Sequence, residues 1–142
     1  MKVLFLDIDG VLNSLEVFEE KDKDLLHPLS EEMIGLVNKI VDETKCTVIL
    51  SSAWRYMGLE VVQGMLDKHG ATFKLAGETP KKDGCRGDEI ISWMADNKVH
   101  DEQIVILDDD ADMDALLPRL VQTKWQFGLK PEHAQRVIEM LK

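Results

Sequence analysis

The chain has 142 residues, of which 44% are hydrophobic and 31% charged, and it carries a formal net charge of −10. This length and composition are typical of one globular domain, which we expect to span residues 1–142. No apolar run approaches the ~20 residues that cross a bilayer, and a protein that holds duplex nucleic acid through phosphate contacts is usually basic. These properties argue against a membrane protein and against stable binding of duplex nucleic acid.

The first ten residues and the cysteines indicate the compartment. MKVLFLDIDG has one Lys and a short apolar run, followed by acids where a secretory signal peptide would have small residues. Cys46 and Cys85 lie far apart and form no CxxC motif. We therefore expect a cytoplasmic protein in which both thiols are reduced.

Strands and helices are predicted to alternate along the chain. Apolar runs and short alternating segments predict strands at 2–7, 46–50, 71–76, 103–107 and 119–123, the last at a sheet edge. Helical periodicity with capping residues predicts helices at 30–43, 58–69, 88–97 and 131–141. Residues 11–29 are interpreted as a loop with a short helical piece, and 77–87 as a loop rich in Lys and Gly. This order predicts a Rossmann-like α/β fold, a parallel sheet of about five strands between two layers of helices.

Polar side chains follow the predicted strands at the points where the strands end. In open parallel sheets, ligands bind beyond the carboxyl ends of the strands. The residues that we expect at this rim are Asp7 and Asp9 after the first strand, Ser51, Ser52 and Arg55 after the second, Asp108, Asp109 and Asp110 after the fourth, and Lys81, Lys82 and Arg86 in the loop before the third helix. Acids, hydroxyls and basic groups are thus predicted to converge.

Two acidic clusters on one rim would repel each other unless a cation lay between them. Carboxylates with few other ligands suit Mg²⁺, and a cation beside basic and hydroxyl groups suits a phosphoryl group. Within DIDG, alternation along an extended chain turns Asp7 and Asp9 in different directions, so one can attack phosphorus while the other handles a proton. An EF-hand is excluded because Met113 and Arg119 stand where its Gly and Glu would be.

Four motifs in order resemble the haloacid dehalogenase (HAD) superfamily, from Asp7 to about Asp112. They are DIDG, the Ser51 of VILSS, a base at Arg86 with Lys82 as the alternative, and the acidic pair of VILDD. More closely, DGVLN, SSAWR, RGDEIISW and ILDDD are similar to the HAD domain of Swiss Army Knife RNA repair proteins and to the phosphatase half of polynucleotide kinase–phosphatases. GLK at 128–130 stands where those proteins tend to have Gly-Leu-Thr.

The resemblance implies a phosphatase that depends on Mg²⁺. Asp7 would attack phosphorus and form an aspartyl-phosphate, and Asp9 would protonate the leaving group and then activate water. The metal would be held by the carboxylate of Asp7, the backbone carbonyl of Asp9 and Asp109, with Asp108 assisting.

The same resemblance implies two contacts to the phosphoryl group. Ser51 would hydrogen-bond its oxygens, and Arg86 would neutralise its charge and steady Asp7. We add Arg55 as a second contact to substrate phosphate, because a guanidinium binds phosphate in a bidentate manner.

The short gaps between the motifs leave no room for a large cap domain, and by resemblance an open site suits a large phosphorylated substrate. A phosphoprotein and a nucleic-acid end both remain open, and we favour a nucleotide or polynucleotide end because a terminal phosphate needs few backbone contacts. A phosphotransferase and a non-catalytic phosphate- or metal-binding module are the alternatives. A response-regulator receiver is excluded, because its phosphoacceptor Asp would sit about where Ser51 and Ser52 stand.

Overall fold

The computed structural model describes residues 1–20 and 27–142. Its strands are β1 (Val3–Leu6), β2 (Thr47–Leu50), β3 (Leu75–Glu78), β4 (Ile104–Asp108) and β5 (Leu120–Gln122). Its α-helices are α1 (Leu15–Glu20), α2 (Glu31–Thr44), α3 (Leu59–Lys68), α4 (Arg86–Asn97) and α5 (Pro131–Leu141). Three 3₁₀ segments lie between them: η1 (Ala53–Met57), η2 (Asp101–Gln103) and η3 (Asp114–Arg119).

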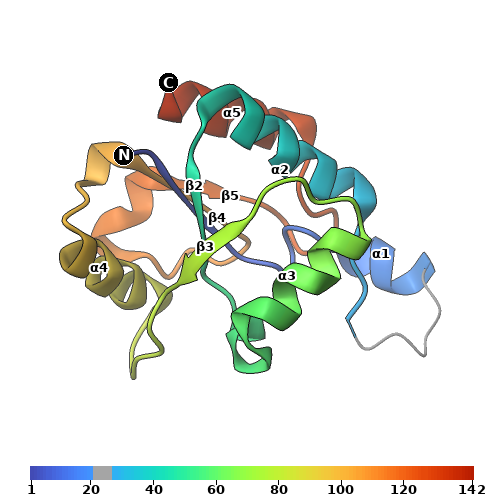
Figure 1. Cartoon of the computed structure of the whole chain (residues 1–142), viewed down its shortest axis with the longest axis horizontal. Coiled ribbons are helices and arrows are strands. Elements are labelled where there is room, and N and C mark those ends of the chain that lie inside the picture. Colours follow the sequence, from blue (N-terminus) through green and yellow to red (C-terminus); the bar gives the residue numbers. More distant parts are fainter. Residues whose placement is uncertain (21–26) are drawn as a thin grey trace.

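The five strands form one parallel sheet in the order β3-β2-β1-β4-β5, which confirms the predicted Rossmann-like α/β fold (Figure 1). The first strand is central: Val3 pairs with Thr47 of β2 on one side and with Ile104 of β4 on the other. The carboxyl ends of β1, β2 and β4 are therefore neighbours. This arrangement brings the polar residues that follow these three strands to one rim.

Alternate residues of β1 point into two separate apolar layers. Leu4 and Leu6 belong to a core with α2, α3 and α5, whereas Val3 and Phe5 belong to a second core with α4 and η3. All four side chains are fully buried. A strand covered on both faces has to be apolar throughout, which is why its sequence, VLFL, shows no polar alternation. The helices therefore form two layers around the sheet, as predicted.

The helix ends follow from local capping. The Ser30 hydroxyl accepts a hydrogen bond from the backbone N–H of Met33 at 3.2 Å, so α2 begins where the cap was predicted. Pro131 occupies the first turn of α5, where a missing N–H costs nothing. The predicted helices at 30–43, 58–69 and 131–141 are confirmed to within a residue at each end.

The strand β3 and the helix α4 begin at different residues from those predicted. β3 spans Leu75–Glu78 rather than 71–76, because Phe73 is buried in the core from an irregular segment that the alternation had placed in the strand. α4 begins at Arg86 rather than at residue 88, because the Asp88 carboxylate accepts a hydrogen bond from the N–H of Cys85 and caps the helix there. Arg86 thus lies in a helical first turn and not in a loop.

One side chain of α4 faces away from the core. Ile91 is 41% exposed, whereas its neighbour Ile90 is fully buried. Consecutive residues of an α-helix point in directions about 100° apart, so only one of these two neighbours faces the sheet.

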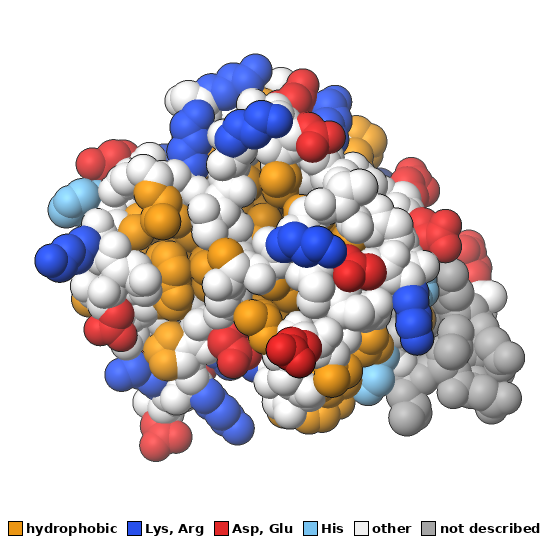
Figure 2. Space-filling view, viewed as in Figure 1, with side chains coloured by type: hydrophobic (Ala, Val, Ile, Leu, Met, Phe, Trp, Pro, Cys, Tyr) orange, Lys and Arg blue, Asp and Glu red, His pale blue; other side chains and the backbone are white. Residues whose placement is uncertain are grey.

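The helical piece predicted within residues 11–29 is α1, and the part of that segment from 21 to 26 lies outside the described residues. Among the described helices, none is long and apolar enough to cross a membrane. On the face shown in Figure 2, acidic and basic side chains are interspersed around patches of apolar side chains. That face therefore carries no continuous surface of one sign, although the chain is acidic as a whole.

Candidate active site

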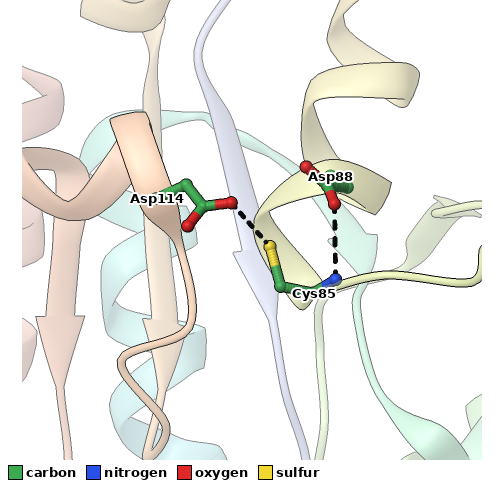
Figure 3. Close-up of side chains that lie close together, drawn as sticks. All are labelled: Cys85, Asp88 and Asp114. Carbon is green, nitrogen blue, oxygen red and sulfur yellow. Dashed lines mark hydrogen bonds between the residues drawn. The ribbon is translucent and has the colours of Figure 1, made fainter.

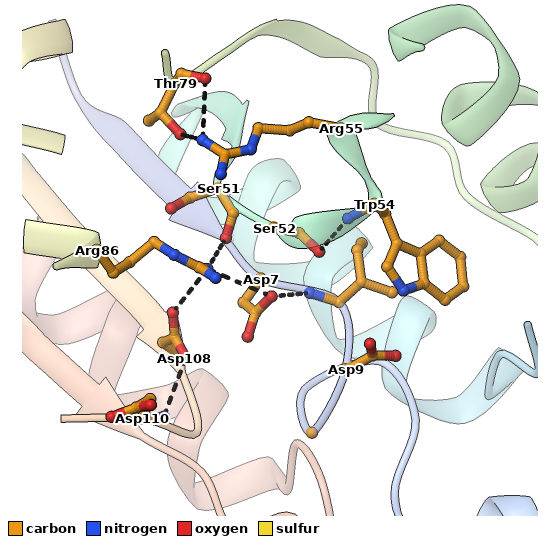
Figure 4. Close-up of polar contacts among 12 residues, drawn as sticks. Asp7, Asp9, Ser51, Ser52, Trp54, Arg55, Thr79, Arg86, Asp108 and Asp110 are labelled. Atoms are coloured by element: carbon orange, nitrogen blue, oxygen red, sulfur yellow. Dashed lines mark hydrogen bonds and ion pairs between the residues drawn. The ribbon is translucent and has the colours of Figure 1, made fainter. Parts of the chain in front are cut away.

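Asp7 directly follows the central strand β1, beside the carboxyl ends of β2 and β4 (Figure 4). Its backbone N–H donates to the carbonyl of Leu107 at 3.0 Å, which continues the ladder between β1 and β4. Its carboxylate Oδ1 accepts the N–H of Ile8 at 2.8 Å. Only 6% of the residue is exposed. Asp7 is thus held in a fixed orientation at a mostly buried position.

Two acids from the end of β4 join Asp7. Carboxylate oxygens of Asp7, Asp108 and Asp109 all lie within 4.8 Å of one another. Gly10, with a φ of +81°, makes this approach possible, since a Cβ there would lie 2.3 Å from Oδ2 of Asp109. Only glycine combines that conformation with that space.

The surroundings of these acids disfavour their charged forms. Burial raises the pKa of Asp7 to about 6, although the positive charge of Arg86 opposes the shift. Burial, followed by the negative charge of Asp7, raises the pKa of Asp108 to about 9. Burial likewise raises the pKa of Asp109. Three crowded carboxylates with raised pKa values fit a hard divalent cation such as Mg²⁺, which would offset their repulsion.

Asp9 lies apart from this cluster. Its side chain is half-buried and accepts a hydrogen bond from Nδ2 of Asn13 at 2.9 Å. The structure therefore separates the two acids of DIDG, as the alternation predicts. Asp110 is exposed, and its backbone N–H donates to Oδ1 of Asp108 at 3.0 Å. Asp110 thus orients Asp108 through its backbone.

Arg86 is the base that the structure brings to the acids. Its Nη1 lies 3.1 Å from Oδ2 of Asp108 and 3.5 Å from Oδ1 of Asp7, and it also donates to the carbonyl of Ser51. Burial alone would lower the pKa of Arg86, but the surrounding carboxylates raise it, so the guanidinium stays charged. Lys82 is exposed, and within the described residues its side chain makes no hydrogen bond or ion pair. Of the two candidate bases, Arg86 alone contacts Asp7.

Ser51 follows β2 and carries a buried hydroxyl. Its backbone N–H pairs with the carbonyl of Leu6, but its Oγ is buried and has no hydrogen-bond partner among the described residues. An unpaired buried hydroxyl costs about 1–3 kcal/mol, so such atoms are rare without a reason. The neighbouring Ser52 has a different task, because its Oγ accepts the N–H of Trp54 at the start of η1.

Arg55 is held by other protein groups. Nη1 donates to the carbonyl and the hydroxyl of Thr79 at 3.1 and 2.8 Å and to the carbonyl of Pro80 at 3.3 Å. Nη2 lies 3.2 Å from both carboxylate oxygens of Glu89. The predicted contact between Arg55 and substrate phosphate stays a prediction, and it would require exchanging one of these bonds.

Two residues missed by the sequence analysis hold the loop after β1. Asn13 accepts the N–H of Gly10 at 2.9 Å and donates to Asp9 and to the carbonyl of Pro28. Thr123 donates its hydroxyl to the carbonyl of Gly10 at 2.6 Å. Both side chains are fully or almost fully buried. The sequence offered a signal only for Asn13, as part of DGVLN.

A second group of metal-type side chains lies at the start of α4 (Figure 3). The thiol of Cys85 donates to Oδ2 of Asp114 at 3.0 Å, and Asp88 accepts the N–H of Cys85 at 3.4 Å. The bond to Asp114 raises the pKa of the thiol. We interpret this group as a tie between α4 and η3. Both Cys85 and Cys46 are free thiols.

Comparison with known protein families matches residues 3–134 to the HAD domain in Swiss Army Knife RNA repair proteins. The chain belongs to this family. Membership in the HAD superfamily indicates phosphatase-type chemistry with Mg²⁺, and the cluster of Asp7, Asp108 and Asp109 supplies suitable ligands for that ion. No curated protein matches this HAD domain.

Proposed function

We propose that this HAD domain hydrolyses a phosphomonoester through an aspartyl-phosphate on Asp7. One observation carries the proposal. The buried carboxylate of Asp7 lies beside a guanidinium and two further carboxylates at the end of one parallel sheet (Figure 4). Ser51, at the end of the neighbouring strand, adds a buried hydroxyl without a partner among the described residues. This set combines a nucleophile, groups that bind phosphoryl oxygens and ligands for a cation, which are the parts that phosphoryl transfer needs.

Two displacements at phosphorus follow from this arrangement. The Asp7 carboxylate attacks phosphorus, the ester P–O bond breaks, and Asp9 gives its proton to the departing oxygen. Asp9 then takes a proton from water, which attacks the same phosphorus and releases inorganic phosphate and the free carboxylate. The different directions of Asp7 and Asp9 support this division of roles, since Asn13 holds Asp9 outside the cluster.

Positive charge and hydrogen-bond donors would stabilise the phosphoryl oxygens. Ser51 Oγ would donate to one of them, which would give this hydroxyl its missing partner. Arg86 would donate through Nη2, a nitrogen without a partner among the described residues. Mg²⁺, held by Asp7, Asp108 and Asp109 with the carbonyl of Asp9, would supply further positive charge against the phosphoryl oxygens.

The metal requirement is tested by colour release from p-nitrophenyl phosphate. We expect turnover with Mg²⁺, none with excess EDTA, and full recovery when Mg²⁺ is restored, because the cation would supply positive charge against the phosphoryl oxygens. Steady-state rates before and after chelation provide the measurement. Equal turnover in EDTA and in Mg²⁺ would contradict the assignment of the acid cluster.

The same assay separates the alternatives. Inorganic phosphate that accumulates in step with p-nitrophenol indicates hydrolysis, whereas a deficit of phosphate in the presence of alcohols indicates transfer to another acceptor. Binding of Mg²⁺ without turnover of any phosphomonoester would favour a non-catalytic module.

A pocket beside Arg86 supports a substrate that carries an aromatic ring near its phosphate. It has a volume of about 780 Å³, and its lining includes Tyr56, Trp93, Lys81 and Arg86. Tyr56 is 74% exposed, an unusual position for a large ring. Aromatic rings next to phosphate-binding groups are typical of sites for unpaired nucleotides. Together with the RNA repair context that the family's description names, this favours a nucleotide or polynucleotide end as the substrate.

Tyr56→Ala tests this assignment of the substrate. We expect the KM for a phosphorylated oligonucleotide end to rise about 10-fold or more, because stacking of a base on an aromatic ring contributes ~1–3 kcal/mol. Kinetics with glycerol phosphate, which has no ring, should not change. Val61→Ala is the matched control, since Val61 is 53% exposed on α3 and lies outside the pocket. An unchanged KM for the oligonucleotide would contradict base stacking on Tyr56.

A further inference from the structure

Glu89 is a buried acid to which the proposed mechanism gives no role. It lies in the first turn of α4, three residues after Arg86, and only 5% of it is exposed. A buried carboxylate is costly unless it is paired, and its partners are therefore informative. Three groups bind it: Nη2 of Arg55, the backbone N–H of Lys82 and Nε of Arg86.

The position of Glu89 is set by the end of β3. Arg55 Nη2 lies 3.2 Å from each carboxylate oxygen of Glu89, while Arg55 Nη1 is bound to Thr79 and Pro80. Thr79 is in turn tied to the sheet, because its backbone N–H donates to the carbonyl of Leu50 at 3.0 Å. A continuous set of hydrogen bonds therefore runs from the sheet through Arg55 to Glu89.

Glu89 and the site acids hold different nitrogens of the Arg86 guanidinium. Nη1 faces Asp7 and Asp108, whereas Nε lies 3.5 Å from Oε1 of Glu89. A planar group anchored at two of its three nitrogens has a fixed orientation. The third nitrogen, Nη2, has no partner among the described residues, and Arg86 lines the pocket next to the cluster.

We infer that Glu89, fixed by Arg55, is a positioning residue that orients the Arg86 guanidinium so that Nη2 meets the transferring phosphoryl group. This inference rests on the proposed function. It gives Arg55 the role of holding Glu89 in place. From the sequence we had expected Arg55 to contact substrate phosphate. Without Glu89, Nη1 alone would anchor the guanidinium, and attraction to Asp7 and Asp108 would draw the charge toward the nucleophile.

Glu89→Gln tests the inference, because glutamine keeps the shape and removes the charge. With p-nitrophenyl phosphate and Mg²⁺, we expect kcat to fall about 10- to 100-fold, since a displacement on the order of 1 Å in a catalytic group has effects of this size. KM should change less than kcat, because the orientation matters most when charge develops. Glu102→Gln, the same change at an exposed position on η2, should leave both constants unchanged.

The decisive measurement is the same substitution in an Arg86→Lys background. Lysine keeps a positive charge but has one nitrogen, so it has no plane for Glu89 to orient. A positioning role predicts that Glu89→Gln costs less than about 3-fold in this background, a strong departure from additivity. An equal loss of kcat in both backgrounds would mean that Glu89 acts only on the stability of the fold, and would overturn the inference.

Glu89→Asp covers the case in which the glutamine variant does not fold. Aspartate keeps the charge and shortens the side chain by one methylene, so a partial loss of kcat is expected in the native background and little loss beside Arg86→Lys. If the wild type is active and the losses of kcat from the substitutions at Glu89 and Arg86 simply add, only the positioning role of Glu89 is contradicted. An inactive wild type would instead contradict the proposed function.

Discussion

Asp7→Asn is expected to abolish turnover of p-nitrophenyl phosphate, with a loss on the order of 10⁴-fold or more. Asparagine is nearly isosteric, and its amide oxygen can still accept the N–H of Ile8, so the fold should survive. An amide does not attack phosphorus, and no aspartyl-phosphate can form on it. Steady-state rates in Mg²⁺ for the two proteins provide the measurement.

The same substitution should stabilise the protein when metal is absent. Burial raises the pKa of Asp7 from the ordinary 3.8 to about 6, so the folded state binds this proton more tightly than the unfolded state does. The contribution of Asp7 to stability is therefore lost as pH rises through about 6. At about pH 8 in EDTA, we expect Asp7→Asn to be more stable than wild type by on the order of 1–3 kcal/mol, with a smaller difference at about pH 4.

Asp67→Asn is the matched control for both measurements. Asp67 lies on α3, forms an exposed ion pair with Lys74, and does not belong to the acid cluster. It should keep its activity and lose little stability, since exposed ion pairs contribute ~0–1 kcal/mol. Retained activity in Asp7→Asn would contradict the assignment of the nucleophile. Lower stability of that variant at alkaline pH would contradict the account of its burial.

Arg86→Met should damage both activity and stability. Asp7, Asp108 and Glu89 all lie within 3.5 Å of this guanidinium, and methionine would leave them without it. Breaking a buried ion pair from one side costs about 3–5 kcal/mol. Loss of a charge that faces the phosphoryl group should lower kcat on the order of 10²–10³-fold. Chemical unfolding and steady-state kinetics measure the two effects.

The pH dependence of that destabilisation identifies its cause. Unpaired carboxylates escape their cost by binding protons, so the loss of stability should be small at about pH 5 and large at about pH 8. Mg²⁺ at the higher pH should restore part of the stability, because the cation offsets two of the three acids. Arg136→Met, at an exposed position of α5, is the control. A loss independent of both pH and Mg²⁺ would point to packing rather than charge.

The sequence predicted the sheet well because its inner strands are apolar without interruption. VLFL, TVIL and IVIL are buried almost throughout, and apolar runs this short are typical of strands rather than of helices. The edge strand β3 was misplaced because LAGE has a weak pattern and the buried Phe73 lies just before it. Its pairing with β2 also shifts register between Val48 and Ile49, which no pattern in the sequence indicates.

The acids, Ser51 and Arg86 could be predicted because each follows a strand or begins a helix at the rim. Glu89 and Thr79 could not, since a glutamate within a helix and a threonine after a strand usually face solvent. The only local signal was the spacing of three between Arg86 and Glu89, which places them on one face of α4. The ion pair between Arg55 and Glu89 could not be predicted either, because sequence shows where a base lies along the chain but not which acid it pairs with.

The central place of β1 has a consequence for how the domain folds. Val3 pairs with Ile104, so the strand that carries Asp7 acquires its second neighbour only when a loop of most of the chain has closed. Such distant pairings form slowly, because the entropy of loop closure is lost before the contacts are gained. Asp7 therefore meets Asp108 and Asp109 only once this distant pairing has formed, so the repulsion between them does not burden the earlier stages of folding.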